Sequence, residues 1–72
     1  MTRDEFLIEM QDVLQTEVIL SMDTVLSELD EWDSLSIMAT MAFLDKSFNI
    51  KTNMKDFLAM KTIKDIADKI GI

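Results

Sequence analysis

The chain of 72 residues contains no cysteine, no histidine and no proline, and it has a single glycine. Without cysteine it forms no disulfide bond and offers no thiolate as a metal ligand or nucleophile. Without histidine it lacks the side chain that most often acts as a general base near neutral pH. A domain of this size without disulfides gains its stability from helix packing. We therefore expect one domain, residues 1–72, that is not an enzyme.

Long apolar runs are also missing, because no stretch approaches the roughly 20 residues that cross a bilayer. Charged residues appear at once in the chain, at Arg3, Asp4 and Glu5, so no secretory signal is indicated. These two observations favour a cytoplasmic protein that does not bind membranes.

The net charge is −7, and it is unevenly distributed. Residues 1–45 carry eleven acidic side chains against Arg3 alone, whereas residues 46–72 carry six lysines against three aspartates. An acidic field repels nucleic acid and attracts basic protein surfaces, although it also serves solubility. We expect protein partners, no nucleic acid and a monomer. The acids Asp30, Glu31 and Asp33 lack the glycine and the closing glutamate of an EF-hand, so no metal site is expected.

Hydrophobic periodicity and capping residues predict four helices. The first covers residues 3–16 and begins at a Thr2–Glu5 capping box. The second covers 34–47 and is followed by Asn49, which tolerates a left-handed conformation. The third is short, 54–60, and the fourth covers 63–70 and ends at Gly71. The predicted fold class is therefore all-α, a four-helix bundle.

The segment 17–33 is predicted to be a long, mostly irregular loop, because it is rich in turn and cap residues. Its apolar residues are expected to hold it on the core: Val18, Leu20, Val25, Leu26 and Leu29. In the third helix, Phe57 and Leu58 are expected to anchor to the same core.

The second helix is predicted to have two apolar stripes. One is expected to face the core and contains Ile37, Met41, Leu44 and Phe48. The other is turned away from the core and contains Leu35, Met38 and Ala42, with Ala39 close by; Ser36 and Phe43 are also expected to point outward. Exposed apolar surface often marks a partner site, although the 17–33 loop or the third helix could cover it.

The start of the second helix is a candidate anion site. Asp33 is expected to be the N-cap, with its carboxylate accepting hydrogen bonds from free amides of the first turn. Ser34 is then the first helical residue, where those amides and the helix dipole favour a phosphate. An Asp-Ser pair at a helix start usually means capping alone. By itself the pair is therefore weak evidence that Ser34 has a function.

The triplet Asp33-Ser34-Leu35 resembles the attachment site of acyl and peptidyl carrier proteins. The segment 48–50, Phe-Asn-Ile, resembles the Phe-Gly-Ile or Phe-Asp-Ile that ends the second helix in that family. Together with the length and the order of elements, the resemblance extends over essentially all 72 residues. It implies a bundle of the acyl-carrier-protein type, with a long loop between the first two helices and a short third helix.

The resemblance also implies a function. A separate phosphopantetheinyl transferase would attach 4′-phosphopantetheine from coenzyme A to Ser34, and the thiol would hold an acyl, aminoacyl or polyketide group as a thioester for loading and transferring enzymes. Asp33 matches the family's aspartate and would assist the Mg²⁺-dependent transfer as well as cap the helix. Leu35 and Met38 match positions that contact partner enzymes, and Ala42 continues their stripe.

One feature departs from the family pattern. Carriers of primary fatty-acid synthesis usually have a strongly acidic second helix, whereas this one has only Asp45, beside Lys46. The departure favours a specialised pathway and docking by apolar contacts. The alternative is an unmodified acidic helical module that binds a partner through Leu35, Met38 and Phe43. The six internal methionines could adapt the core to a sheltered acyl chain, although gap-filling in a small core is the commoner use.

Overall fold

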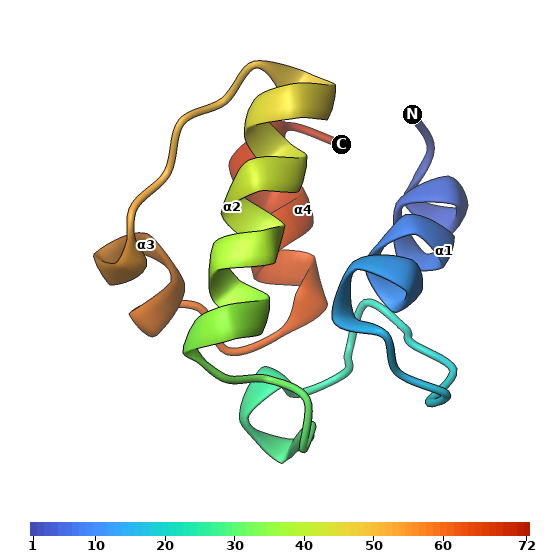
Figure 1. Ribbon diagram of the computed structural model, residues 1–72. Helices are drawn as coiled ribbons and strands as arrows, with labels where there is room; N and C mark the ends of the chain where they lie inside the picture. Colours follow the sequence, from blue (N-terminus) through green and yellow to red (C-terminus); the bar gives the residue numbers. More distant parts are fainter.

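The computed structural model describes residues 1–72 and contains four α-helices and one short 3₁₀-helix. In chain order they are α1 (Arg3–Leu14), η1 (Leu26–Glu28), α2 (Ser34–Phe48), α3 (Met54–Leu58) and α4 (Ile63–Ile70). Figure 1 shows α2 at the centre, with α4 behind it and α1 and α3 on opposite sides. The predicted all-α four-helix bundle is confirmed. None of the helices has the length and apolar composition that crossing a membrane requires.

Every α-helix begins with a capping box, in which the side chains of the N-cap and N3 residues bind each other's backbone N–H. In α1, Thr2 Oγ1 accepts from the Glu5 amide at 3.1 Å and Glu5 Oε1 accepts from the Thr2 amide at 2.9 Å. In α4, Asp65 Oδ2 accepts from the amides of Lys61 at 2.7 Å and Thr62 at 3.1 Å. These backbone donors lower the pKa of Glu5 and the pKa of Asp65 below their ordinary values.

Three helices end at a residue in the left-handed conformation: Gln15, Asn49 and Gly71. Asn49 and Gly71 were predicted in this role, since both tolerate positive φ. Gln15 was not, and because it takes φ 52° the first helix ends at Leu14 and not at residue 16. The second helix runs one residue beyond its predicted end.

The core is formed by twelve buried hydrophobic residues from all four α-helices and from the loop between α1 and α2, residues 15–33, which is called the first loop below. They are Phe6, Met10, Leu14, Leu20, Leu26, Leu29, Ile37, Leu44, Phe57, Ile63, Ile66 and Ala67. The outward orientation predicted for Phe43 is wrong, because its ring centroid lies 6.2 Å from the ring centroid of Phe6 and 5.9 Å from that of Phe48. Packing these aromatic rings against one another removes apolar area from water, and this gain turns Phe43 inward. The helical spacing alone had placed its side chain on the outward face.

The loop between α1 and α2 is pinned more tightly than the sequence indicates. It contains η1, and Val25 forms an isolated antiparallel bridge with Thr62 at the start of α4. Leu20, Leu26 and Leu29 are buried as predicted, but Val18 is 48% exposed. The prediction for Val18 is wrong because the chain turns after α1 and buries Thr16 instead, with Thr16 Oγ1 accepting from the Val18 amide at 3.1 Å.

The short helix α3 uses one side chain as its anchor. Phe57 is buried, and its ring centroid lies 6.1 Å from the ring centroid of Trp32. Leu58, in contrast, is 73% exposed. The predicted anchoring by Leu58 is wrong, because a helix of five residues that ends at Leu58 turns only one of this neighbouring pair toward the core.

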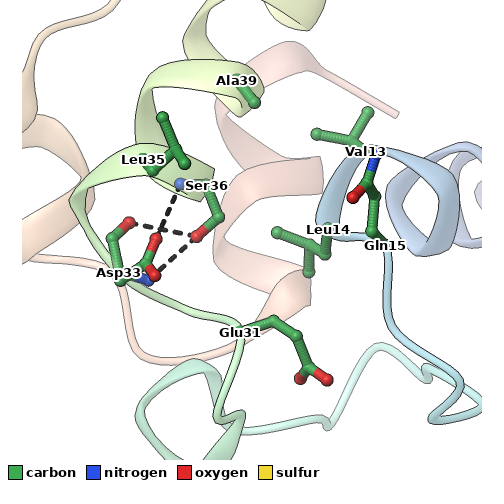
Figure 2. Close-up of a pocket in the computed structure, with 8 residues that line it drawn as sticks. All are labelled: Val13, Leu14, Gln15, Glu31, Asp33, Leu35, Ser36 and Ala39. Carbon is green, nitrogen blue, oxygen red and sulfur yellow. Dashed lines mark hydrogen bonds between the residues drawn. The ribbon is translucent and has the colours of Figure 1, made fainter.

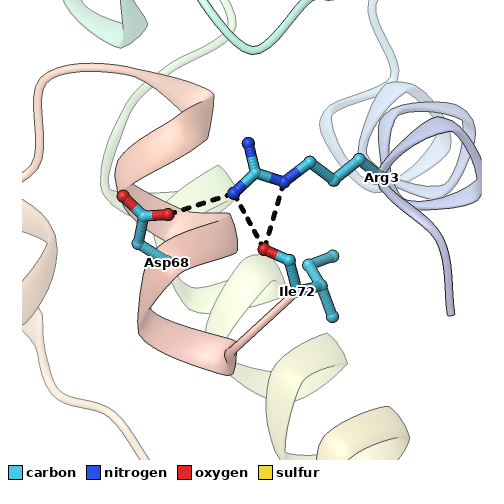
Figure 3. A network of polar contacts seen from close by, with 3 residues as sticks. All are labelled: Arg3, Asp68 and Ile72. Atoms are coloured by element: carbon cyan, nitrogen blue, oxygen red, sulfur yellow. Dashed lines mark hydrogen bonds and ion pairs between the residues drawn. The ribbon is translucent and has the colours of Figure 1, made fainter.

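The two ends of the chain are joined by Arg3 (Figure 3). Its Nε and Nη2 donate to the Ile72 carbonyl oxygen at 3.1 and 2.9 Å, and Nη2 also donates to Asp68 Oδ1 at 3.2 Å. These contacts tie the start of α1 to the end of α4 and close the bundle around α2.

Candidate functional site

The start of α2 is fixed by Asp33 and Ser36 (Figure 2). Asp33 Oδ1 accepts from the Ser36 amide at 2.9 Å. In return, Ser36 Oγ accepts from the Asp33 amide at 2.9 Å and donates to the Asp33 carbonyl at 3.0 Å. The N-cap predicted at Asp33 is confirmed. The role of Ser36 was missed, and its outward placement is wrong, because these hydrogen bonds turn it inward and bury it. A hydroxyl three residues after an N-cap aspartate was the available signal.

Ser34 is exposed at the first position of α2, and its hydroxyl makes no hydrogen bond within the chain. Two amides of the first turn, those of Ser34 and Leu35, also have no partner in the chain. The next two are occupied, since the Ser36 amide binds Asp33 Oδ1 and the Ile37 amide binds the Asp33 carbonyl at 2.9 Å. The site therefore combines an accessible hydroxyl with two free donors and the positive end of a helix dipole. Such a site fits a phosphate ester.

The apolar stripe predicted on the outer side of α2 is exposed in the structure. Leu35 is 77% exposed, Met38 is 56% exposed and Ala42 is also exposed. Neither the first loop nor α3 covers them. An uncovered apolar surface thus begins one residue from Ser34 and continues along the helix.

Charges near the site are negative and come from the segment that leads into α2. Glu31 is half-buried and Asp33 is exposed, whereas the first turn of α2 contains no acidic residue. The single acid within the helix, Asp45, lies at the far end and pairs with Lys51 at 3.3 Å. No group of three or more potential acidic, histidine or cysteine ligands is positioned to hold a metal ion.

A cleft of about 370 Å³ lies between the end of α1 and the start of α2 (Figure 2). Its lining residues are Val13, Leu14, Gln15, Glu31, Asp33, Leu35, Ser36 and Ala39. The sequence did not predict this cleft, because its two walls come from segments that are distant in the chain. The residues on either side of Ser34 both line it.

Comparisons with known proteins agree with this arrangement. A family model described as the phosphopantetheine attachment site matches residues 5–70. The fold is similar to the solution structure of a holo acyl carrier protein from Geobacter metallireducens, with a TM-score of 0.76 and 27% sequence identity. The match covers 96% of this chain and 80% of that one. No curated protein sequence matches the chain.

Proposed function

Because the chain belongs to the phosphopantetheine attachment family and is a non-catalytic carrier protein of the acyl-carrier type, we propose that Ser34 bears its covalently bound 4′-phosphopantetheine. The group supplies a thiol on a flexible arm, on which an acyl or aminoacyl cargo is held as a thioester. The observation that carries the proposal is the exposed Ser34 hydroxyl beside the unpaired amides of Ser34 and Leu35. Ser36, two residues on, is buried and its hydroxyl is already bound.

The residues around Ser34 have separate roles in this proposal. Ser34 Oγ forms a bond to the phosphorus of coenzyme A that carries pantetheine; the pyrophosphate bond breaks, adenosine 3′,5′-bisphosphate leaves and the serine proton passes to a base of the transferase. The free amides and the helix dipole stabilise the phosphodiester. Asp33 holds the first turn in place through Ser36 and would assist the transfer complex.

Mass spectrometry tests the proposal. The chain is incubated with coenzyme A, Mg²⁺ and a promiscuous phosphopantetheinyl transferase, and the intact mass is measured. The wild-type chain should gain one phosphopantetheinyl group and Ser34→Ala should gain none. Ser47→Ala is the matched control, because Ser47 is an exposed serine at the other end of α2 and its substitution should leave the gain intact. A wild-type chain that stays unmodified would instead favour the unmodified interaction module.

We further propose that partner enzymes dock on the apolar stripe of Leu35, Met38 and Ala42. Its support is the exposure of these side chains beside Ser34, together with the absence of acids from the exposed middle of α2. The acids of the first loop, which include Glu28, would steer basic partner surfaces toward the stripe. This mode of docking supports a role in a specialised pathway, with an acyl, aminoacyl or polyketide cargo, over a role in primary fatty-acid synthesis.

The docking proposal predicts a specific change in transferase kinetics. Leu35→Ser should raise the KM for the carrier about tenfold, equivalent to roughly 1.4 kcal/mol, because it removes apolar contact at the centre of the interface. Ile8→Ser is the control, since Ile8 is 69% exposed on α1 and lies outside the stripe. Equal effects of the two substitutions would contradict docking on the stripe.

A further inference from the structure

We infer that the far end of the apolar stripe, at Ala42 and beyond, selects partner enzymes that place an acidic side chain there. This inference rests on the proposed docking of partners on the stripe of Leu35, Met38 and Ala42. Lys46 lies four residues after Ala42, so it continues the same face of α2, and it is exposed. The stripe therefore runs from the acidic start of α2 to a cation in the last turn.

A hollow of about 280 Å³ adjoins the far end of the stripe. It is lined by Met41, Ala42, Asp45, Lys51 and Thr52. Lys51 lies in the connection from α2 to α3 (Figure 1) and pairs with Asp45 at 3.3 Å. Thr52 Oγ1 is buried without a hydrogen-bond partner, so the wall of the hollow contains a donor that the chain leaves unsatisfied. A partner on the stripe borders this hollow, whereas the larger groove between η1 and α3 shares no residue with the stripe.

The charges at the far end favour an acidic partner side chain over a basic one. Asp45 is already paired with Lys51, and Lys46 has no ion pair in the chain. The Lys51 side chain is 83% exposed, and its ammonium group keeps donors for a second acceptor. A carboxylate from a partner would thus find two cations against one anion. A basic side chain would instead have to displace Lys51 from Asp45.

The near end of the stripe has the opposite charge. Leu35 lines the cleft beside α1 together with Glu31 and Asp33, and no cation lines that cleft. Ser34 and Lys46 are twelve residues apart in α2, which corresponds to about 18 Å along the helix. This distance exceeds the Debye length of about 8 Å at physiological ionic strength, so a partner interacts with the two ends separately. A docked partner is therefore oriented, with its basic groups near the attachment site and an acidic group at the far end.

The thiol of the attached arm allows a direct test. Because the chain has no cysteine, the modified full chain contains a single thiol. It is equilibrated in a glutathione redox buffer with two synthetic peptides at equal concentration. Both peptides have one cysteine, a flexible linker and the same helix with a leucine face and lysines near the cysteine. At the end remote from the cysteine, one peptide has two glutamates and the other has two glutamines.

Glutathione disulfide serves as the oxidant, and exchange joins the arm thiol to a peptide thiol as a disulfide. Mass spectrometry measures the ratio of the glutamate conjugate to the glutamine conjugate. The same ratio in urea corrects for the reactivity of the peptides themselves. We expect the folded chain to favour the glutamate peptide about threefold, a size that exposed ion pairs reach.

Charge reversals locate the effect. Lys51→Glu should lower the ratio to one or below. Lys69→Glu is the matched control, because Lys69 is an exposed lysine on α4 and its reversal changes the net charge equally. It should leave the ratio unchanged. A wild-type ratio of one or less, or equal ratios in the two variants, would overturn the selection of an acidic side chain.

The failures of the underlying proposals are separate. A chain that gains no arm forms no conjugate, which would overturn the attachment at Ser34. Leu35→Ser should bring the ratio close to one, because it weakens the docking that holds the peptide along the stripe. A ratio that falls in Lys51→Glu but not in Leu35→Ser would overturn docking on the stripe.

Discussion

The start of α2 differs from the starts of α1 and α4, although all three are capping boxes. In α1 and α4 a threonine is the N-cap and an acid, Glu5 or Asp65, is the N3 residue. In α2 the order is reversed, with the acid Asp33 at the N-cap and the neutral Ser36 at N3. As a result, the first turn of α2 has no acidic residue, whereas those of α1 and α4 do.

The difference shows how one local motif serves two purposes. An acid inside the first turn stabilises a helix by partly neutralising the positive end of its dipole. In α1 and α4 that stabilisation is supplied by the chain itself. In α2 the neighbouring acid, Asp33, precedes the helix and is bound to the Ser36 amide. The amides of Ser34 and Leu35 have no partner, and no acid lies inside the first turn to compete with an anion for them. The start of α2 is thus suited to bind a phosphate group that another molecule supplies.

The largest effect is expected from removing the Asp33 cap. Asp33→Ala should lower the free energy of unfolding by about 1–2 kcal/mol, since it leaves the Ser36 amide without its acceptor. Asp33→Asn should keep most of this stability, because asparagine caps as well as aspartate. Urea unfolding measures both. A similar loss in the two variants would mean that charge, and not the cap, sets the stability of this turn.

Removing the Ser36 hydroxyl, the neutral partner in the same capping box, should have a smaller effect on stability. Ser36→Ala should lower the free energy of unfolding by about 1 kcal/mol, because it removes the hydrogen bonds of Ser36 Oγ with the Asp33 amide and carbonyl. Amide hydrogen exchange should then be faster at Asp33 while α4 keeps its protection. Unchanged exchange at Asp33 would show that the hydroxyl does not hold the turn.

The smallest effect is expected at α4 and depends on pH. The Lys61 and Thr62 amides lower the pKa of Asp65, so its folded-state pKa is below its unfolded value of 3.8. Its stabilising contribution is therefore present above pH 3.8 and is lost as the pH falls through the folded pKa. Asp65→Asn should flatten this part of the acid unfolding curve relative to the wild type. A wild-type and variant pair with parallel curves below pH 4 would contradict the contribution of Asp65.

Local chemistry made much of this fold predictable. The caps Thr2 and Asp33 and the terminators Asn49 and Gly71 are recognisable because each residue type has a direct hydrogen-bonding or conformational preference. The exposed stripe of α2 followed from helical spacing. The position of Ser34 at the first turn followed from the N-cap, which is one residue before it.

The errors concern contacts between distant segments. Phe43 is turned inward by Phe6, which belongs to another helix, and Thr16 replaces Val18 in the core because the chain turns at Gln15. The cleft beside Ser34 could not be predicted for the same reason, since one wall is the end of α1 and the other is α2. Periodicity reports which face of a helix is apolar, but it does not report which segment packs against that face.

The central claim is that the chain offers one serine for modification because of how α2 begins. Five serines are present in the sequence, and two of them, Ser34 and Ser36, lie in the same helical turn. Fragmentation mass spectrometry of the wild-type chain, after treatment with coenzyme A and a phosphopantetheinyl transferase, locates the added group directly. The account predicts the group on Ser34 and an unmodified Ser36. A group found on Ser36 or on any other serine, or a chain that carries none, would contradict it.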